Sequence, residues 1–318
     1  MTTRNEAWTE YWQSGALHSC VGSLDEGYGG AIGDYWRRTA DSFAKRAAVL
    51  DIATGNGPLP KLLAGLRADL QITGIDAAAI APGWWSASAF PQVEMLGNTP
   101  LAALAAQGRS FDVLTSQFGW EYIPRPESVQ QTVALSAPGA RWYLVCHHAQ
   151  GRLAQVAQAE VDGASRLLAP QGLLQAAITL LPYVRLASTD ATRLNADATA
   201  VAARIAYNAA ITELGQAITS SVAPDVMIQA RQGVHQLLQR AAQDPSFGAE
   251  STLRQWRSAV ERSVLRSGEL VSHALSVADM DALRTTLPAD AVVNVNELRQ
   301  AEGLLAWAIE VTLPKRWA

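Results

Sequence analysis

Short, mostly apolar runs alternate with helix-like stretches along the first half of the chain. The runs are bounded by glycine, proline or polar residues, at 47–52, 70–75, 93–96, 111–116 and 141–147. Runs of this kind are typical of buried parallel strands. Apolar residues recur with helical spacing between them, at 58–66, 101–107 and 126–135. This alternation predicts βαβ units and a parallel sheet, with a turn at Pro138-Gly139 before the fifth strand.

The pattern changes after about residue 150. From 151 to about 273 almost no strand-like run is present, and apolar residues recur at helical spacing. A helix at 277–287 and strands at 291–295 and 304–313 then restore the alternation. An aromatic-rich helical segment at 8–48, interrupted by glycines, precedes the first strand. We therefore expect an α/β fold, with a Rossmann-like, doubly wound, mostly parallel seven-stranded sheet, N-terminal helices and an all-α insertion.

The domain organisation follows from these elements. Residues 1–149 hold the N-terminal helices and the first part of the α/β core, 150–274 form the helical insertion, and 275–318 complete the core. The insertion could be a lid, a wall of the substrate pocket or the surface of a homodimer.

Composition excludes several classes of function. The 318 residues carry a net charge of −4, so no basic surplus indicates a nucleic-acid partner. The two cysteines, Cys20 and Cys146, lack metal-ligand spacing, so we expect neither a disulfide framework nor a metal site. A signal-like apolar region near the N-terminus and a run of about 20 apolar residues are both missing, which favours a cytoplasmic protein without a membrane partner.

Chemistry concentrates in the loop after the first predicted strand. Residues 51–57 are Asp-Ile-Ala-Thr-Gly-Asn-Gly, and glycines allow a tight turn against which a ligand can lie. The helix that follows would present free N–H groups that suit a carboxylate or phosphate. Asp76 closes the second predicted strand, where its carboxylate can accept from both hydroxyls of a ribose. Ligands collect at this edge of an open α/β sheet, so loop and acid together predict a nucleoside site.

These residues resemble the motifs of the class I S-adenosylmethionine-dependent methyltransferases. Residues 49–57 are similar to the family's first motif, 72–76 to the second, whose acid binds ribose, and 96–99 to the loop that touches adenine. Residues 111–119 are similar to the fourth strand and the loop beneath the methionine half. The resemblance implies S-adenosylmethionine as cofactor and S-adenosylhomocysteine as product. It implies cofactor contacts from Asp51, Ala53, Thr54, Gly55, Gly57, Asp76, Ala77, Asn98, Thr99, Ser116 and Phe118.

Other families with glycine loops fit less well. A nicotinamide-dependent Rossmann enzyme has Gly-x-Gly-x-x-Gly after the strand, and Pro60 stands at the third position. A Walker loop is excluded because no Gly-Lys-Ser/Thr follows. This sequence departs from the methyltransferase pattern at Ala53, because most members of the family have glycine at that position. Since Ser116-Gln117-Phe118-Gly119 replaces the Asn/Asp-Pro-Pro-Tyr motif of many amide and amine methylating relatives, we expect a small-molecule acceptor rather than nucleic acid.

Candidate catalytic residues lie at the end of the fifth predicted strand. Strand alternation turns His147 or His148 toward the cleft, where a histidine can act as general base near pH 7. A structural histidine is the alternative. Glu121 could be an acid or base, or a solvated carboxylate. The candidates for the substrate pocket are Tyr11, Trp12, His18, Trp120 and Tyr122, and simple packing on the core is the alternative for the N-terminal ones.

The sequence therefore predicts an enzyme that moves a methyl group from S-adenosylmethionine to an O or N atom of a small or medium organic acceptor. Two alternatives stay open. One is an enzyme of the same fold that uses S-adenosylmethionine for alkyl transfer or cyclisation. The other is a non-catalytic protein that binds the same molecule.

Overall fold

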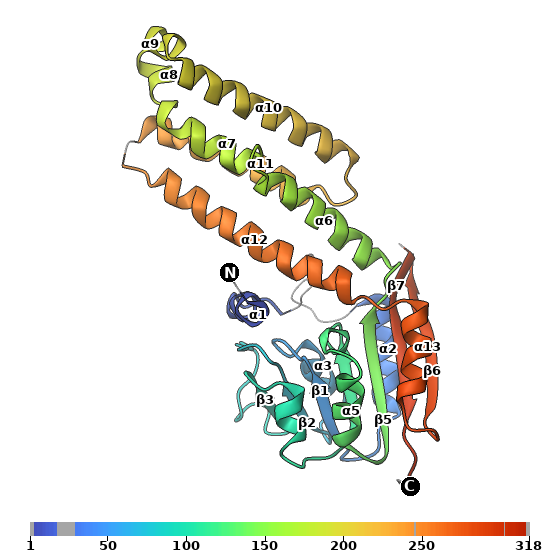
Figure 1. Cartoon of the computed structure of the whole chain (residues 1–318). Helices are drawn as coiled ribbons and strands as arrows, with labels where there is room; N and C mark the ends of the chain where they lie inside the picture. Colours follow the sequence, from blue (N-terminus) through green and yellow to red (C-terminus); the bar gives the residue numbers. More distant parts are fainter. Residues whose placement is uncertain (1–2, 18–28, 245, 302, 316–318) are drawn as a thin grey trace. The chain divides into compact units, whose positions relative to one another are not determined.

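The computed structural model describes residues 3–17, 29–244, 246–301 and 303–315. The chain divides into two compact units: 1–154 together with 269–318 form the α/β unit, and 155–268 form the helical unit. Figure 1 shows both units in one cartoon.

The α/β unit is built around a seven-stranded sheet in the order β3-β2-β1-β4-β5-β7-β6. The first five strands are parallel, and β7 runs antiparallel between β5 and β6. The strands are β1 (Ala48–Ile52), β2 (Gln71–Ile75), β3 (Val93–Leu96), β4 (Phe111–Gln117), β5 (Ser136–His147), β6 (Val292–Gln300) and β7 (Gly303–Thr312). The predicted fold class, a Rossmann-like, mostly parallel seven-stranded sheet, is confirmed.

The prediction of a turn before the fifth strand is wrong. β5 already begins at Ser136, so the Pro138-Gly139 pair lies inside it. The pairing with β4 is irregular here, because Phe111 pairs with Ser136 whereas Val113 pairs with Arg141. The extra residues of β5 form a bulge, which accommodates a proline without a backbone N–H and a glycine at φ 79°.

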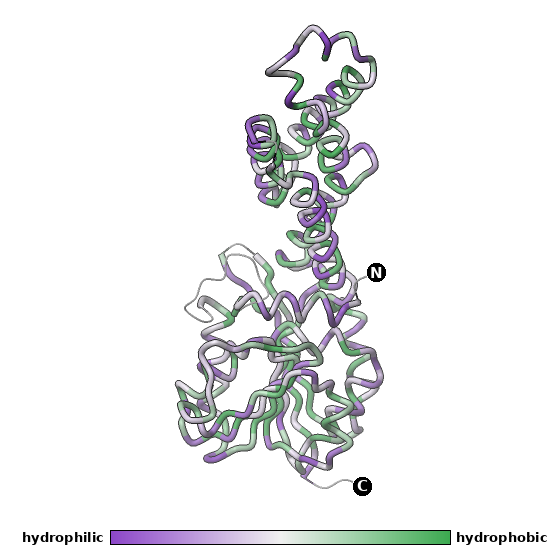
Figure 2. The backbone as a smooth tube through the Cα atoms, turned by 90° about the vertical axis from the view of Figure 1, so that its left-hand side faces the viewer, coloured by the Kyte–Doolittle hydropathy of each residue, from purple (hydrophilic) through white to green (hydrophobic). Residues whose placement is uncertain are grey.

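Helices cover both faces of the sheet. One face packs against α2 and α3, with Trp36, Leu59 and Leu63 buried against Val49 and other strand residues. The other face packs against α4, α5 and α13. Figure 2 shows hydrophobic residues along the strands between these layers. The helices of this unit are α1 (Arg4–Gln13), α2 (Gly30–Asp41), α3 (Pro58–Leu66), α4 (Leu101–Ala105), a 3₁₀ turn (Trp120–Tyr122), α5 (Glu127–Ala134) and α13 (Val277–Thr286).

The helical unit has a core of its own, formed by leucines and smaller apolar residues such as Leu167, Leu214 and Leu237. Its helices, the first and last of which extend into the α/β unit, are α6 (Arg152–Leu168), α7 (Leu173–Leu180), a 3₁₀ turn (Leu181–Tyr183), α8 (Leu186–Thr189), α9 (Ala191–Ala196), α10 (Ala198–Ser220), α11 (Asp225–Gln243) and α12 (Ala249–His273). Among the described residues, no helix combines the length and apolar character needed to cross a membrane.

Candidate functional site

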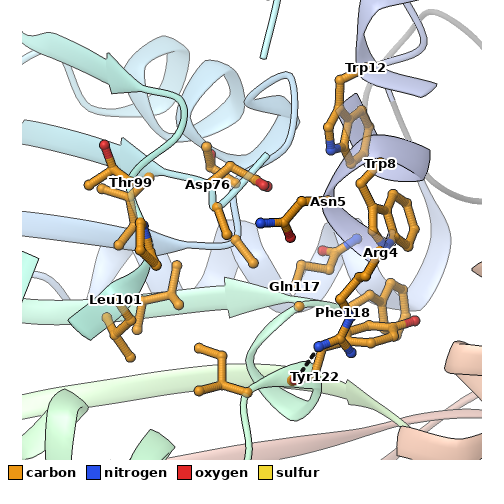
Figure 3. Close-up of a pocket in the computed structure, with 18 of the residues that line it drawn as sticks. Arg4, Asn5, Trp8, Trp12, Asp76, Thr99, Leu101, Gln117, Phe118 and Tyr122 are labelled. Carbon is orange, nitrogen blue, oxygen red and sulfur yellow. Dashed lines mark hydrogen bonds between the residues drawn. The ribbon is translucent and has the colours of Figure 1, made fainter. Parts of the chain in front are cut away.

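A cavity of about 330 Å³ opens at the carboxyl ends of β1, β2 and β4 in the α/β unit. Strand ends and their loops form one wall, and α1 forms the opposite wall, as Figure 3 shows. Polar and aromatic side chains around it include Arg4, Asn5, Trp8, Trp12, Asp76, Thr99, Gln117, Phe118 and Tyr122. The volume lies within the range of small-molecule sites.

Asp76 is the acidic side chain that reaches this cavity. It follows β2 and is 9% exposed. One carboxylate oxygen accepts from the backbone N–H of Gly55 at 2.9 Å, and the other from that of Ala78 at 2.8 Å. Burial raises the pKa of Asp76, and these two donors oppose the rise. Since each carboxylate oxygen accepts two hydrogen bonds, both retain a lone pair for a ligand.

Asp51, which the sequence predicts to contact the cofactor, holds the glycine loop in place. It is 2% exposed and does not line the cavity. Its oxygens accept from the hydroxyls of Thr54 at 2.6 Å and Thr115 at 2.8 Å, so it ties the glycine loop to β4. Burial raises the pKa of Asp51 to about 7, with a smaller contribution from the negative charge of Asp76.

The backbone donors of the glycine loop are largely used within the protein. The N–H of Thr54 donates to Ile75, that of Gly55 to Asp76, and that of Gly57 to Thr54. Pro58 and Pro60 in the first turn of α3 have no N–H. The two prolines therefore reduce the number of N–H groups that this helix start can present to an anion.

The two glycines of the loop are covered by side chains and do not form part of the ligand surface. Gly55 and Gly57 do not line the cavity. Trp12 of α1 covers Gly55, and Met95 with Trp84 covers Gly57. By contrast, Ala53 and Thr54 of the same loop do line the cavity.

Asn56 joins the N-terminal helix to this loop. Its amide nitrogen donates to the carbonyls of Trp12 and Ala16, both at 2.8 Å, and its amide oxygen accepts from the N–H of Ala81 at 2.8 Å. The side chain is 2% exposed. A single buried amide therefore holds three segments of the chain together beside the cavity.

The remaining predicted cofactor contacts divide into two groups. Ala77, Thr99 and Phe118 line the cavity. Asn98 and Ser116 do not. Asn98 is at φ 52° in a turn and donates its backbone N–H to Ala78, and the hydroxyl of the fully buried Ser116 links the ends of β1 and β4.

Neither histidine predicted to be catalytic lines the cavity. His147 is 2% exposed and lies behind Phe118, with the two rings stacked at a centroid distance of 4.2 Å. Its Nδ1 lies 2.7 Å from the buried Glu121 carboxylate. His148 stacks on Trp307 at 4.2 Å, and burial lowers its pKa. Strand alternation does separate the two rings, but Phe118 covers the one nearer the site.

The predicted substrate-pocket residues are also divided. Trp12 and Tyr122 line the cavity. Tyr11 packs edge-on against Trp12, and Trp120 is 1% exposed in the core, so neither reaches it. His18 lies outside the described residues. Arg4, Asn5 and Gln117 line the cavity but were not predicted from the sequence. Gln117 could have been identified, because it is a polar residue at the carboxyl end of a parallel strand, where ligands bind in this kind of sheet.

Arg4 fixes the start of α1 at the other end of the cavity. Its Nε donates to Glu269 at 2.6 Å and one terminal nitrogen to the Tyr122 carbonyl at 3.1 Å. Its guanidinium carbon lies 5.5 Å from the centre of the Tyr122 ring. In the described ranges, no group of three or more His, Cys, Asp and Glu side chains is arranged to hold a metal ion.

Comparison with known proteins gives partial likenesses. No family model matches the chain, and no curated protein matches it. The plantazolicin methyltransferase BpumL in complex with SAH matches 89% of this chain and 81% of its own, at 10% identity and a TM-score of 0.41. The complex of the Haloferax volcanii Trm112 methyltransferase activator with its methyltransferase matches 37% of this chain and 52% of the other, at 15% identity and a TM-score of 0.32. An Agrobacterium tumefaciens SAM-dependent methyltransferase matches 38% and 45%, at 12% identity and a TM-score of 0.30. The chain thus spans about half the length of the last two structures.

Proposed function

We propose that this chain is an S-adenosylmethionine-dependent methyltransferase that moves a methyl group to an O or N atom of a small or medium organic acceptor. The observation that carries the proposal is the placement of Asp76 at the end of β2, in the wall of the cavity. Its two oxygens are held by backbone donors and keep lone pairs for the two hydroxyls of a ribose.

The neighbouring lining residues suit the rest of a nucleoside. Ala77, Thr99 and Leu101 line the same cavity as Asp76, with Ile75 beside them, so the surface is mainly apolar with one hydroxyl. An adenine ring can lie against such a surface, since binding sites for flat cofactors are mostly apolar with few polar groups. The residues present therefore fit the cofactor that the sequence motifs imply.

The backbone N–H groups of the glycine loop are poorly placed to bind a dinucleotide. A pyrophosphate is bound by free N–H groups at a helix N-terminus. Here Gly55 and Gly57 donate within the protein, and the first turn of α3 contains Pro58 and Pro60. A nucleoside without phosphates is the better match to this loop.

S-adenosylmethionine, when bound, supplies a methyl group activated by a positively charged sulfonium. Trp12, Phe118 and Tyr122 bring aromatic faces to the cavity, and such faces stabilise a nearby cation. Among the described lining residues there is no histidine, lysine or cysteine. We infer that α1 and these rings act by positioning the acceptor and excluding water, which suits an acceptor atom that already has a free lone pair.

Binding calorimetry with S-adenosylmethionine and S-adenosylhomocysteine tests the proposal. Binding of both is expected, and failure of the folded protein to bind either would remove it. Incubation with candidate amines, phenols and carboxylic acids should then yield S-adenosylhomocysteine. Methylthioadenosine as the product would instead support alkyl transfer or cyclisation, and binding without any turnover would support a non-catalytic protein.

A further inference from the structure

The side-chain amide of Gln117 is held in one orientation at the cavity. Gln117 is the last residue of β4 and lines the cavity. Its Oε1 accepts a hydrogen bond from the indole Nε1 of Trp36. An indole nitrogen can only donate, so the atom facing Trp36 must be the amide oxygen. The amide nitrogen of Gln117 is therefore the atom left for a ligand, and Figure 3 shows this side chain pointing toward the middle of the cavity.

The residue that fixes Gln117 is itself immobilised. Trp36 lies on α2, is 0% exposed, and packs among apolar residues between α2 and the sheet. Its ring meets Tyr35 edge-on at a centroid distance of 5.2 Å. A side chain locked in this way can fix the orientation of a hydrogen-bonding partner at little further entropic cost.

Several donors around this cavity are already used within the protein, while the side-chain amide of Asn5 also lines it. Three N–H groups of the glycine loop are used within the protein, and two further positions are prolines. The hydroxyl proton of Thr54 is directed to Asp51. The guanidinium of Arg4 already contacts Glu269, whose carboxylate balances its charge. Gln117 offers two amide protons, and no described residue accepts a hydrogen bond from them.

We propose that the amide nitrogen of Gln117 donates to the carboxylate of the cofactor's amino-acid half, and that Trp36 is the positioning residue that keeps this donor turned into the cavity. The inference rests on the proposed function. In proteins whose glycine loop has free N–H groups, the loop backbone can bind an anion. Here a side chain from β4 would do so instead.

Two ligands isolate this contact. S-adenosylhomocysteine carries the carboxylate, and S-adenosyl-3-thiopropylamine is the same molecule with the carboxylate removed. Calorimetric dissociation constants for both ligands are measured with the wild type, Gln117→Leu, Gln117→Glu and Trp36→Phe. Gln71→Leu is the matched control, because Gln71 is exposed at the start of β2, outside the cavity. Thermal melting confirms that each variant is folded.

Gln117→Leu is expected to weaken S-adenosylhomocysteine binding about ten-fold or more, the effect of losing a hydrogen bond to a charged group. Gln117→Glu should weaken it further, because two carboxylates would then face each other. Trp36→Phe keeps an aromatic ring at this position but removes the N–H together with part of the indole, so a smaller loss of the same kind is expected once melting shows that the variant is folded. None of these variants should change binding of the decarboxylated ligand by more than about two-fold.

Several results would overturn the inference. Equal loss for both ligands in Gln117→Leu, or no loss for either, would show that Gln117 does not contact the carboxylate. An unchanged S-adenosylhomocysteine affinity in Trp36→Phe would remove the positioning role. A wild type that binds both ligands equally well would overturn the inference while leaving the proposed function intact. A wild type that binds neither would overturn the proposed function and this inference with it.

Discussion

Trp12 lies so close to Gly55 that a β-carbon built on Gly55 would come within 2.6 Å of its indole ring. Gly55 is also at φ 54°, a conformation that side chains other than glycine rarely adopt. The glycine is therefore required by the N-terminal helix that packs on the loop, as well as by the turn. This contact couples the identity of a loop residue to the position of the opposite cavity wall.

We expect Gly55→Ala to destabilise the protein by roughly 2 kcal/mol or more, because strain at positive φ adds to the clash with Trp12. Chemical denaturation measures the change. In a Trp12→Leu background the clash is relieved, so Gly55→Ala should then cost only about 1 kcal/mol. Additive effects of the two substitutions would show that the rings and the glycine are not coupled.

Asp76→Asn should weaken both S-adenosylhomocysteine and its decarboxylated analogue by roughly 2 kcal/mol, or about thirty-fold. The amide can accept on one atom only, whereas the carboxylate accepts from Gly55 and Ala78 and still has lone pairs. Calorimetry with both ligands gives the test. Asp112→Asn is the control, because Asp112 also accepts from one backbone N–H but lies near the start of β4. Equal affinity of Asp76→Asn and wild type would remove Asp76 from the ribose site.

Asp51 should make the protein less stable as the pH rises. Its pKa is raised from 3.8 to about 7 in the folded protein, so folding takes up a proton between these values. Stability from this group is then fully present below the lower value and is lost as the pH approaches 7. We expect the melting temperature of Asp51→Asn to fall less than that of the wild type between pH 5 and 8. Parallel curves would contradict this account.

The buried pair of His147 and Glu121 should be coupled. Their side chains are 2% and 0% exposed, and His147→Leu would remove the imidazole partner of the Glu121 carboxylate, which would keep the backbone N–H of residue 147 as a donor. We expect His147→Leu to cost about 3 kcal/mol in the free energy of unfolding, since breaking a buried pair is strongly destabilising. The double variant with Glu121→Leu should be more stable than His147→Leu alone. A double variant that loses the sum of both single effects would refute the coupling.

His148→Gln provides the comparison for the same region. His148 contacts Trp307 rather than Phe118, and it does not line the cavity. We expect this variant to bind S-adenosylhomocysteine within about two-fold of the wild type. A large loss would restore His148 as a direct participant at the site.

The sheet and the position of Asp76 could be predicted from the sequence because both depend on local patterns. Apolar runs end where strands end, and an acid directly after β2 must lie at the carboxyl edge of the sheet. The bulge in β5 could not be predicted, since a proline-glycine pair signals a turn unless the pairing partner is known. Pairing is a tertiary property.

The other half of the cavity depends on contacts between distant residues. Nothing local to Trp12 indicates that it will cover Gly55, and nothing local to Gln117 indicates that Trp36 will fix its amide. Strand alternation predicts that either His147 or His148 faces the site. The structure keeps the alternation but places Phe118 in front of the His147 ring, which a one-dimensional pattern does not contain.

The location of α1 has a consequence for the order in which the protein is made. α1 is synthesised before the other helices and strands described here, yet Arg4 pairs with Glu269, 265 positions later in the chain, and Trp12 and Asn56 meet only after β1 exists. A nascent chain can therefore form the strand-end wall of the cavity well before the helix opposite it is fully anchored. The Arg4–Glu269 pair can form only after translation has passed Glu269, whereas every described residue that lines the cavity lies between Arg4 and Gln131.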